Sequence, residues 1–392
     1  MTLSDELLAS VEHSVDRHRG ELADLATKIH AHPELRFEET RAAAWICDLL
    51  SAHGFTVERG LGGMPTAFRA KCGHGPGPRV AILAEYDALP QIGHACGHNL
   101  IAAGAVGAFL AAAEAAGRAA GEVVLLGTPG EEGGGGKIKL LEAGAFAELD
   151  AALMFHPLDR DLVAHHTLAS LWLTFAFTGT PSHAAATPHE GRSALTACMD
   201  TFRLVDGQRV HFRDGVRVHG YITNGGQAVN IIPEHAACEF SVRARDVDEL
   251  ARVRAIVERC ARAAAMASDV TVEIAVRQGY RDLRNNAAMA RAFAAHTAAL
   301  GRPSREADPD LGAGSTDMGD VSHVVPSIHP YLAICDEGST TCHEHAFAAA
   351  ACSERGIATT MIAAKAMART ALEILADTQL RTAIRDEFAA PR

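Results

Sequence analysis

One stretch constrains the fold more than any other: an apolar strand that leads through a polar loop into an alanine-rich helix. Val80–Ala84 has the composition of a buried strand, and the helix is expected to run from about Asn99 to Ala116. A buried strand followed by a buried helix is typical of a parallel sheet covered by helices on both faces. Ligands of such sheets lie outside the carboxyl ends of the strands, so the loop between strand and helix predicts a functional site.

This loop is rich in side chains that can hold a metal ion. Glu85 and Asp87 follow the strand directly, and His94, Cys96 and His98 lie within the next few positions. Cysteine and histidine suit zinc and similar ions, and the start of a helix favours the thiolate form of a cysteine. Taken alone, the same pattern also fits a loop with an incidental cysteine and hydrogen-bonded histidines.

Two further strand ends carry donors of the same kind. Val123–Gly127 precedes Glu131 and Glu132, and two adjacent carboxylates are costly unless a cation neutralises one, which leaves the other as a base. Ala151–Phe155 is expected to be a strand that ends at His156. Each feature alone fits an acidic turn or a structural histidine. Three strand ends with such donors together predict a metal site at this edge of the sheet.

A run of glycines follows the two glutamates and ends at Lys137. Such a run can indicate a phosphate-binding loop, but the Walker spacing requires Gly at position 131 and Ser or Thr at position 138. Glu131 and Ile138 stand there instead, so a phosphate loop is not predicted.

The pattern of the chain changes near Leu171. From there to about Val276 the expected order is β-α-β-β-α-β, the split-βαβ arrangement. We therefore expect an α/β fold in which residues 1–170 and 281–392 form a metal-binding catalytic domain with a mostly parallel sheet flanked by helices. Residues 171–280 are expected to form an inserted ferredoxin-like dimerisation or lid domain. A four-stranded sheet leaves an exposed edge, which a partner often covers, so a homodimer is expected.

Composition and charge argue against several classes of protein. The net charge is -12, from 36 basic and 48 acidic residues, which disfavours a nucleic-acid partner. Nine scattered cysteines without a Cys-x-x-Cys motif are typical of reduced thiols in a cytoplasmic protein. The N-terminus lacks the basic and apolar regions of a signal peptide, and the longest apolar run, Leu100–Ala113, is too short to span a bilayer. We expect a cytoplasmic protein with no membrane partner.

Several segments together carry a resemblance to a known family. They are HPELRFEET (32–40), DALP (87–90), GHACGHN (93–99), TPGEE (128–132), SHAAATPHEGRSAL (182–195), NGGQAVNIIP (224–233) and GSTDMGDVS (314–322). The chain resembles the dinuclear-metal aminoacylase and carboxypeptidase family of metallopeptidases, closest to its amidohydrolase branch. That branch includes aminoacylase-like dipeptidases, aminobenzoyl-glutamate hydrolases and auxin-conjugate hydrolases. The resemblance implies one or two divalent ions, zinc or manganese, and hydrolysis of N-acyl amino acids, aminobenzoyl-glutamate-like conjugates or small dipeptides.

The resemblance also implies a role for particular residues. The metal ligands would be Cys96, His98, Glu132, His156 and His343, with Cys96 in the place of a bridging aspartate of many relatives. Glu131 would be the general base, and Asp87 would orient the ligands. In the inserted domain, His183 and Asn230 would hold the substrate or the oxyanion, His183 either in its own chain or across the dimer.

Some positions depart from the family pattern or stay open. Other members carry His-x-Asp after the first strand, whereas Glu85 stands at that histidine position, which leaves the number of metal ions open. Asn99 replaces an aspartate of the auxin-type relatives and disfavours an auxin-conjugate substrate. His343 is preferred to His345 as the C-terminal ligand because it lies four residues before Phe347. The roles of His94, His219 and His345 remain open.

Two other classes of function are compatible with parts of the sequence. Cys96 with His94 or His98 could form a cysteine hydrolase, but the glutamate pair and His156 would then have no role. A non-catalytic binding protein on the same fold would be expected to lack Glu131, which is present. Sensitivity to chelators rather than to thiol alkylation would separate a metalloenzyme from a cysteine hydrolase.

Overall fold

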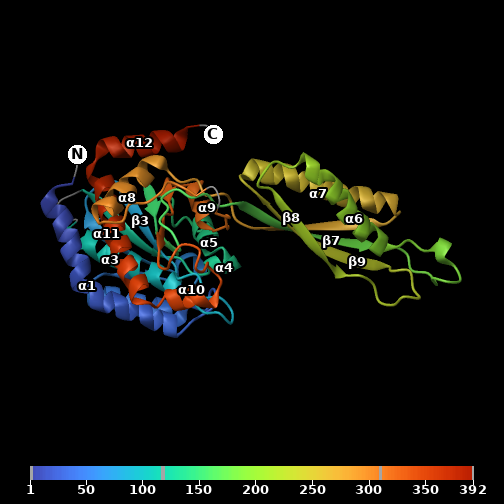
Figure 1. The fold of residues 1–392 in the computed structure, drawn as a ribbon, viewed down its shortest axis with the longest axis horizontal. Coiled ribbons are helices and arrows are strands. Elements are labelled where there is room, and N and C mark those ends of the chain that lie inside the picture. Colours follow the sequence, from blue (N-terminus) through green and yellow to red (C-terminus); the bar gives the residue numbers. More distant parts are fainter. Residues whose placement is uncertain (1–2, 116–119, 309–310, 391–392) are drawn as a thin grey trace. The chain divides into compact units, whose positions relative to one another are not determined.

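A computed structural model describes residues 3–115, 120–308 and 311–390 (Figure 1). The chain divides into two compact units. The first comprises Met1–His166, Leu283–Gly312 and Asp317–Arg392, and the second comprises Thr167–Asp282 and Ala313–Thr316. The sequence places the corresponding boundaries after residues 170 and 280. It does not predict the short return of Ala313–Thr316 to the second unit.

The first unit is built on a six-stranded mixed sheet with the order β1-β2-β4-β3-β5-β11. The strands are β1 (Val57–Arg59), β2 (Phe68–His74), β3 (Arg79–Ala84), β4 (Gly121–Gly127), β5 (Ala151–Leu153) and β11 (Ser327–Ile328). β4, β3, β5 and β11 are parallel to one another, whereas β2 pairs antiparallel with both β1 and β4. The expected α/β fold is present, and the expectation of a mostly parallel sheet holds for four of its strands.

Helices cover both faces of this sheet (Figure 1). The helices of the unit are α1 (Asp5–Ala31), α2 (Thr40–Ala52), α3 (His98–Ala115), α4 (Glu131–Gly134), α5 (Gly136–Glu142), α8 (Ala287–Ala299), α9 (Met318–Ser322), α10 (His345–Ala350), α11 (Glu354–Ala376) and α12 (Thr378–Ala389). Ile82 and Leu125 pack with α1, α3 and α11, whereas Leu83 and Leu126 pack with α5 and α9. Because successive side chains of a strand point to opposite faces, both faces are buried and the strands are continuously apolar.

Helix α3 lies in the core of the first unit. By length and composition it is the one helix of the described residues that could cross a membrane, but 89% of it is buried inside the protein, as in a core helix. Asn99, at its start, donates hydrogen bonds from Nδ2 to the carbonyl oxygens of Ala26 and Ala351, which ties α3 to α1 and to the end of α10. Ala116, where the helix was expected to end, lies outside the described residues.

The strand expected over Ala151–Phe155 is wrong at its end. β5 stops at Leu153, and His156 instead begins β6 (His156–Leu158), which pairs in parallel with β12 (Tyr331–Ala333). The pairing of β5 with β11 has the same register as the pairing of β6 with β12. The two pairings therefore form one parallel ladder that is interrupted between β5 and β6. Pro330 lies in the interruption and has no N–H to donate, which explains the break. His156 therefore opens a short two-stranded sheet.

The second unit contains a four-stranded antiparallel sheet with the order β10-β7-β9-β8. Its elements, in chain order, are β7 (Ala169–Thr178), α6 (Ala194–Gln208), β8 (Arg217–Asn224), β9 (His235–Ala244), α7 (Val247–Ala267) and β10 (Thr271–Gln278). Every second residue of β9 is buried, and α6 and α7 pack on that face (Figure 1). Asp246 caps α7 by accepting a hydrogen bond from the Glu249 N–H.

Candidate metal centre

The five side chains that the sequence identifies as metal ligands lie together in the first unit. Donor atoms of Cys96, His98 and His156 lie within 4.8 Å of one another, and so do donor atoms of Cys96, Glu132 and His343. Four of the five come from segments that follow β3, β4 and β5, three neighbouring strands of the sheet, and the fifth comes from the segment before α10. Because Cys96 belongs to both groups, its thiolate could bridge two ions.

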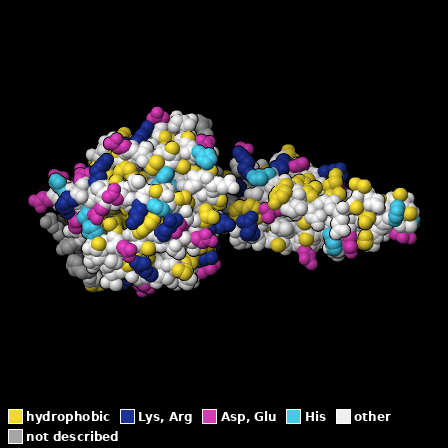
Figure 2. Space-filling view, turned by 90° about the horizontal axis from the view of Figure 1, so that it is seen from below, with side chains coloured by type: hydrophobic (Ala, Val, Ile, Leu, Met, Phe, Trp, Pro, Cys, Tyr) yellow, Lys and Arg dark blue, Asp and Glu magenta, His cyan; other side chains and the backbone are white. Residues whose placement is uncertain are grey.

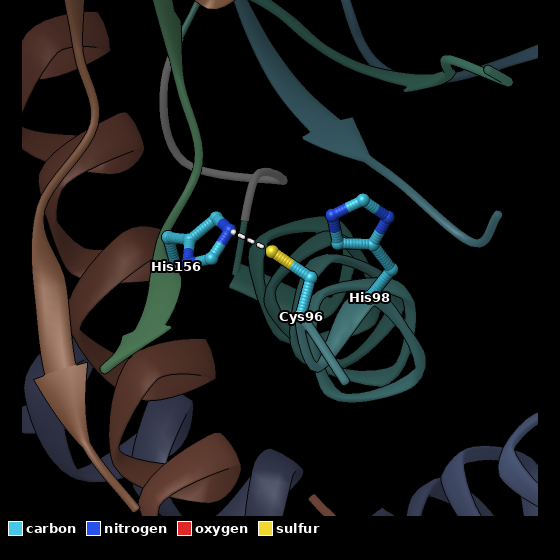
Figure 3. Close-up of side chains that lie close together, drawn as sticks. All are labelled: Cys96, His98 and His156. Carbon is cyan, nitrogen blue, oxygen red and sulfur yellow. Dashed lines mark hydrogen bonds between the residues drawn. The ribbon is translucent and has the colours of Figure 1, made fainter. Parts of the chain in front are cut away.

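Cys96 and His156 face each other directly (Figure 3). The Cys96 Sγ lies 3.5 Å from Nε2 of His156. Nδ1 of His156 lies 2.7 Å from the carbonyl oxygen of Pro157, to which it donates its proton, and this leaves the Nε2 lone pair directed at the thiol. Burial lowers the pKa of His156 to about 4, so the ring is neutral at pH 7, the form that binds metals.

Asp87 positions two of the ligand residues. Its Oδ1 lies 3.0 Å from Nδ1 of His98, and its Oδ2 accepts a hydrogen bond of 2.9 Å from the Glu132 N–H. Burial alone would lower the pKa of His98, but the carboxylates of Asp87 and Glu85 outweigh it and raise that pKa well above its ordinary value. A carboxylate on the far nitrogen of a histidine is the usual support of a metal ligand, because it orients the ring and fixes its tautomer.

Atoms without hydrogen bonds mark the place where a cation would fit. Nε2 of His98 and Oε1 of Glu132 are buried and make no hydrogen bond to the described residues, and they lie 4.0 Å apart. Nε2 of His343 faces the same glutamate oxygen from 3.4 Å. Buried polar atoms without partners are costly, and a divalent ion would satisfy them. The residues present therefore fit one or two divalent ions of the kind that histidine, thiolate and carboxylate ligands hold.

The backbone places the first and last of these ligands. Gly97, between the ligands Cys96 and His98, has φ +75°, and a Cβ there would lie 2.8 Å from Cγ of Pro157. This position therefore requires glycine. His343 also has a positive φ, 73°, although it is not glycine, and its N–H donates a 2.8 Å hydrogen bond to the carbonyl oxygen of Ala95. Such strained residues persist where the surroundings hold them and cluster at functional sites.

Glu131 and Glu132 both face the site. Their carboxylates and a nitrogen of His98 lie within 4.8 Å of one another. Glu132 leaves helical geometry within α4, with φ -64° and ψ 73°, and Gly130 before the pair has φ 70°. Burial and the charge of Glu132 raise the pKa of Glu131 well above its ordinary value. A buried carboxylate with a raised pKa, next to the ligands, has the character of a general base.

His183 and Asn230 lie beside each other in the second unit. The Ala184 N–H donates a 3.1 Å hydrogen bond to the carbonyl oxygen of Asn230. Nδ1 of His183 accepts hydrogen bonds of 3.2 Å from the N–H groups of Ala185 and Ala186, so this ring stabilises its own turn. Both side chains are exposed, and their role toward a substrate stays a prediction.

The three histidines whose roles the sequence left open lie in three different environments. His94 is buried against the ring of His30, 6.1 Å away, His219 lies on β8, and His345 is exposed at the start of α10. None of the three belongs to a donor group formed by the described residues. His343, in contrast, belongs to the donor group of Cys96 and Glu132.

Sequence reasoning missed a buried ion cluster beside the ligands. Nζ of Lys137 lies 2.5 Å from Oε1 of Glu85 and 2.7 Å from Oδ1 of Asp317, and all three side chains are buried. The available signals were a lysine after a glycine run and an aspartate in the GSTDMGDVS segment. Nothing in their spacing shows that two residues 180 positions apart meet.

Comparisons with known proteins show the family of this chain. The model of peptidase family M20/M25/M40 matches residues 81–372. The chain is 38% identical over 391 residues to the Xaa-Arg dipeptidase of Mus musculus, covering 95% of this chain and 90% of that protein. It is 35% identical over 290 residues to one subunit of the p-aminobenzoyl-glutamate hydrolase of Escherichia coli, covering 68% of this chain and 60% of that subunit. A Bacillus subtilis protein described as a dinuclear metal binding peptidase has the same fold, with TM-score 0.73 over 92% and 99% of the chains at 20% identity.

Proposed function

The chain belongs to peptidase family M20/M25/M40, and from this premise we propose that it is a metal-dependent amidohydrolase that cleaves small dipeptides or related amides. Family membership confirms the resemblance that the sequence motifs carry. The observation that carries the proposal is the pair of donor groups that share Cys96, with Glu131 beside them. We propose two divalent ions, zinc or manganese, since each group supplies three donors.

Each residue of the site has a defined part in this reaction. When bound, the ions act as Lewis acids and lower the pKa of a water molecule toward neutrality. Glu131 takes a proton from the attacking water and returns it to the leaving amine. Asp87 holds His98 and the backbone of Glu132 in place. His183 and Asn230 would hold the substrate or the oxyanion.

The substrate class is proposed from the relatives and tested by a screen. Dipeptides with a C-terminal arginine come first because the mouse dipeptidase matches 95% of this chain, and aminobenzoyl-glutamate and N-acyl amino acids come next. The purified protein, incubated with zinc or manganese, is expected to release a free amino acid from at least one of these. Glu131→Gln serves as the inactive control. Release from none of them, by a protein that holds metal, would contradict the proposal.

A cysteine hydrolase is a poorer description of the same residues. The neighbouring thiol of Cys342 and burial raise the pKa of Cys96 well above its ordinary value. An activated cysteine nucleophile requires the opposite shift. The place of Cys96 in two groups of metal-type donors supports a metal ligand instead.

We further propose a cytoplasmic protein without nucleic-acid or membrane partners. All nine cysteines are free, as in a reducing compartment. On the face shown in Figure 2, basic and acidic side chains are interspersed, without the basic patch that nucleic acid requires.

We propose that the second unit is the inserted ferredoxin-like domain and that it pairs two chains. The sheet order β10-β7-β9-β8, with both helices on one face, supports the first part. The outermost strand β8 is exposed, and its Tyr221 and Ile222 keep 61% and 40% of their surface, which supports the second.

Light scattering at micromolar concentration tests the dimer. The wild-type chain is expected to be a dimer, and Tyr221→Lys with Ile222→Lys to shift it toward monomer by placing charges on the edge. Met266→Lys, which changes another exposed hydrophobic residue of this unit on α7, is the matched control and should leave the dimer intact. A monomeric wild-type protein would contradict the pairing but not the domain.

A further inference from the structure

Lys137 connects three parts of the first unit through buried charges. Its Nζ donates to Oε1 of Glu85, just after β3, and to Oδ1 of Asp317. Its own N–H donates a second bond, of 2.9 Å, to Oδ2 of Asp317. Lys137 lies in α5, and the short helix α4 just before it carries Glu131 and Glu132. The cluster therefore joins the end of β3, the start of α5 and the segment before α9.

One oxygen of Glu85 is directed at the metal ligands. Oε1 is held by Lys137, whereas Oε2 is buried and makes no hydrogen bond to the described residues. Oε2 lies 3.4 Å from Nε2 of His98, the nitrogen that Asp87 leaves available to an ion. Glu85 does not belong to any of the donor groups of the described residues, so the geometry gives it a place next to the ligands rather than among them.

We propose that Glu85 is a positioning residue of the metal centre, held by Lys137 and Asp317, which presents a fixed negative charge to the ion-binding nitrogen of His98. The inference rests on the proposed function, because it requires that His98 hold an ion.

The charges of the cluster support this role. Two carboxylates and one ammonium leave one negative charge in excess, and the unpaired oxygen places it at His98. Nζ of Lys137, 2.5 Å from Oε1 of Glu85, is the cation that holds this buried side chain as a carboxylate. Buried ion clusters contribute little to stability compared with apolar residues of the same size. A role toward the ion explains why one occurs here.

Glu85→Gln tests the proposal through metal affinity. The substitution keeps the shape and the contact with Lys137 but removes the charge. The two ions are measured separately by stepwise competition with a chelator. We expect the ion held by Cys96, His98 and His156 to bind about 10- to 100-fold more weakly, the usual effect of removing an outer support. The ion held by Cys96, Glu132 and His343 should change little.

The matched control is Glu249→Gln in the second unit. Glu249 is also a buried glutamate with a cationic partner, Arg252, and it belongs to the second unit, whereas all five proposed ligands belong to the first. The control should leave both affinities unchanged. Equal affinities in Glu85→Gln and the wild type would overturn the proposal, whereas a wild-type protein that binds no metal would overturn the proposed function instead.

If Glu85→Gln does not fold, a second variant tests the proposed role of Glu85. Changing all three members together, Glu85→Gln, Lys137→Met and Asp317→Asn, removes every buried charge while it preserves approximate volume. The proposal predicts that this variant folds and that it binds the ion held by Cys96, His98 and His156 at least about 10-fold more weakly than the wild type does. Wild-type affinity in this neutral variant would show that the cluster is only structural and would overturn the proposal.

Discussion

The variant Glu131→Gln is expected to keep its metal ions and to lose about 10²- to 10⁴-fold of turnover, the usual contribution of general acid-base catalysis. Glutamine preserves the shape of the side chain but cannot take a proton from water or return one to the leaving amine. The raised pKa of Glu131, caused by burial and the adjacent Glu132, gives this residue the proton affinity of a base. Turnover and metal content are measured on the same samples.

Glu132→Gln is the matched control because it changes the neighbouring side chain in the same way. It removes a charged ligand, so metal binding should weaken by about 1–3 kcal/mol, the usual cost of a lost charged interaction. Near-wild-type turnover in Glu131→Gln would contradict the assignment. So would a loss of metal in Glu131→Gln that does not occur in Glu132→Gln.

The second large effect is expected at Cys96, which belongs to both donor groups. Cys96→Ala removes a ligand from each of two ions, so both affinities should fall by more than the roughly 100-fold that removal of an outer support can cost. Turnover should fall with them. Isothermal titration of the metal-free variant with zinc or manganese measures the loss.

Cys96→Asp is the informative companion variant. A carboxylate is also a metal ligand and could serve both donor groups, so metal binding and part of the turnover should return. A cysteine hydrolase would lose its nucleophile in both variants. If Cys96→Asp binds both ions but is inactive, the hypothesis that Cys96 serves solely as a metal ligand would be contradicted.

The parts of the site that could be predicted follow from local rules. Donors at the ends of apolar strands converge because parallel strands end at one edge of a sheet, which brings Cys96, Glu132 and His156 together. The interruption at Pro330, which makes His156 open β6, depends on which residue lies opposite in a distant segment. A single sequence does not contain that register.

The buried cluster of Lys137 with Glu85 and Asp317 could not be predicted for a related reason. A lysine after glycines is normally exposed, and only the tertiary fold brings it between two carboxylates 52 and 180 positions away. The return of Ala313–Thr316 to the second unit is likewise a tertiary contact of a short segment without a strand or helix pattern.

We propose that one chain holds two divalent ions and that Cys96 would be a ligand of both. Elemental analysis of the purified protein, after incubation with zinc or manganese and removal of free metal, tests it most directly. The two donor groups predict about two ions per chain, and Cys96→Ala should hold far less. Wild-type protein with less than about 0.2 ion per chain would contradict the claim, because a site with these ligands should retain its metal through purification.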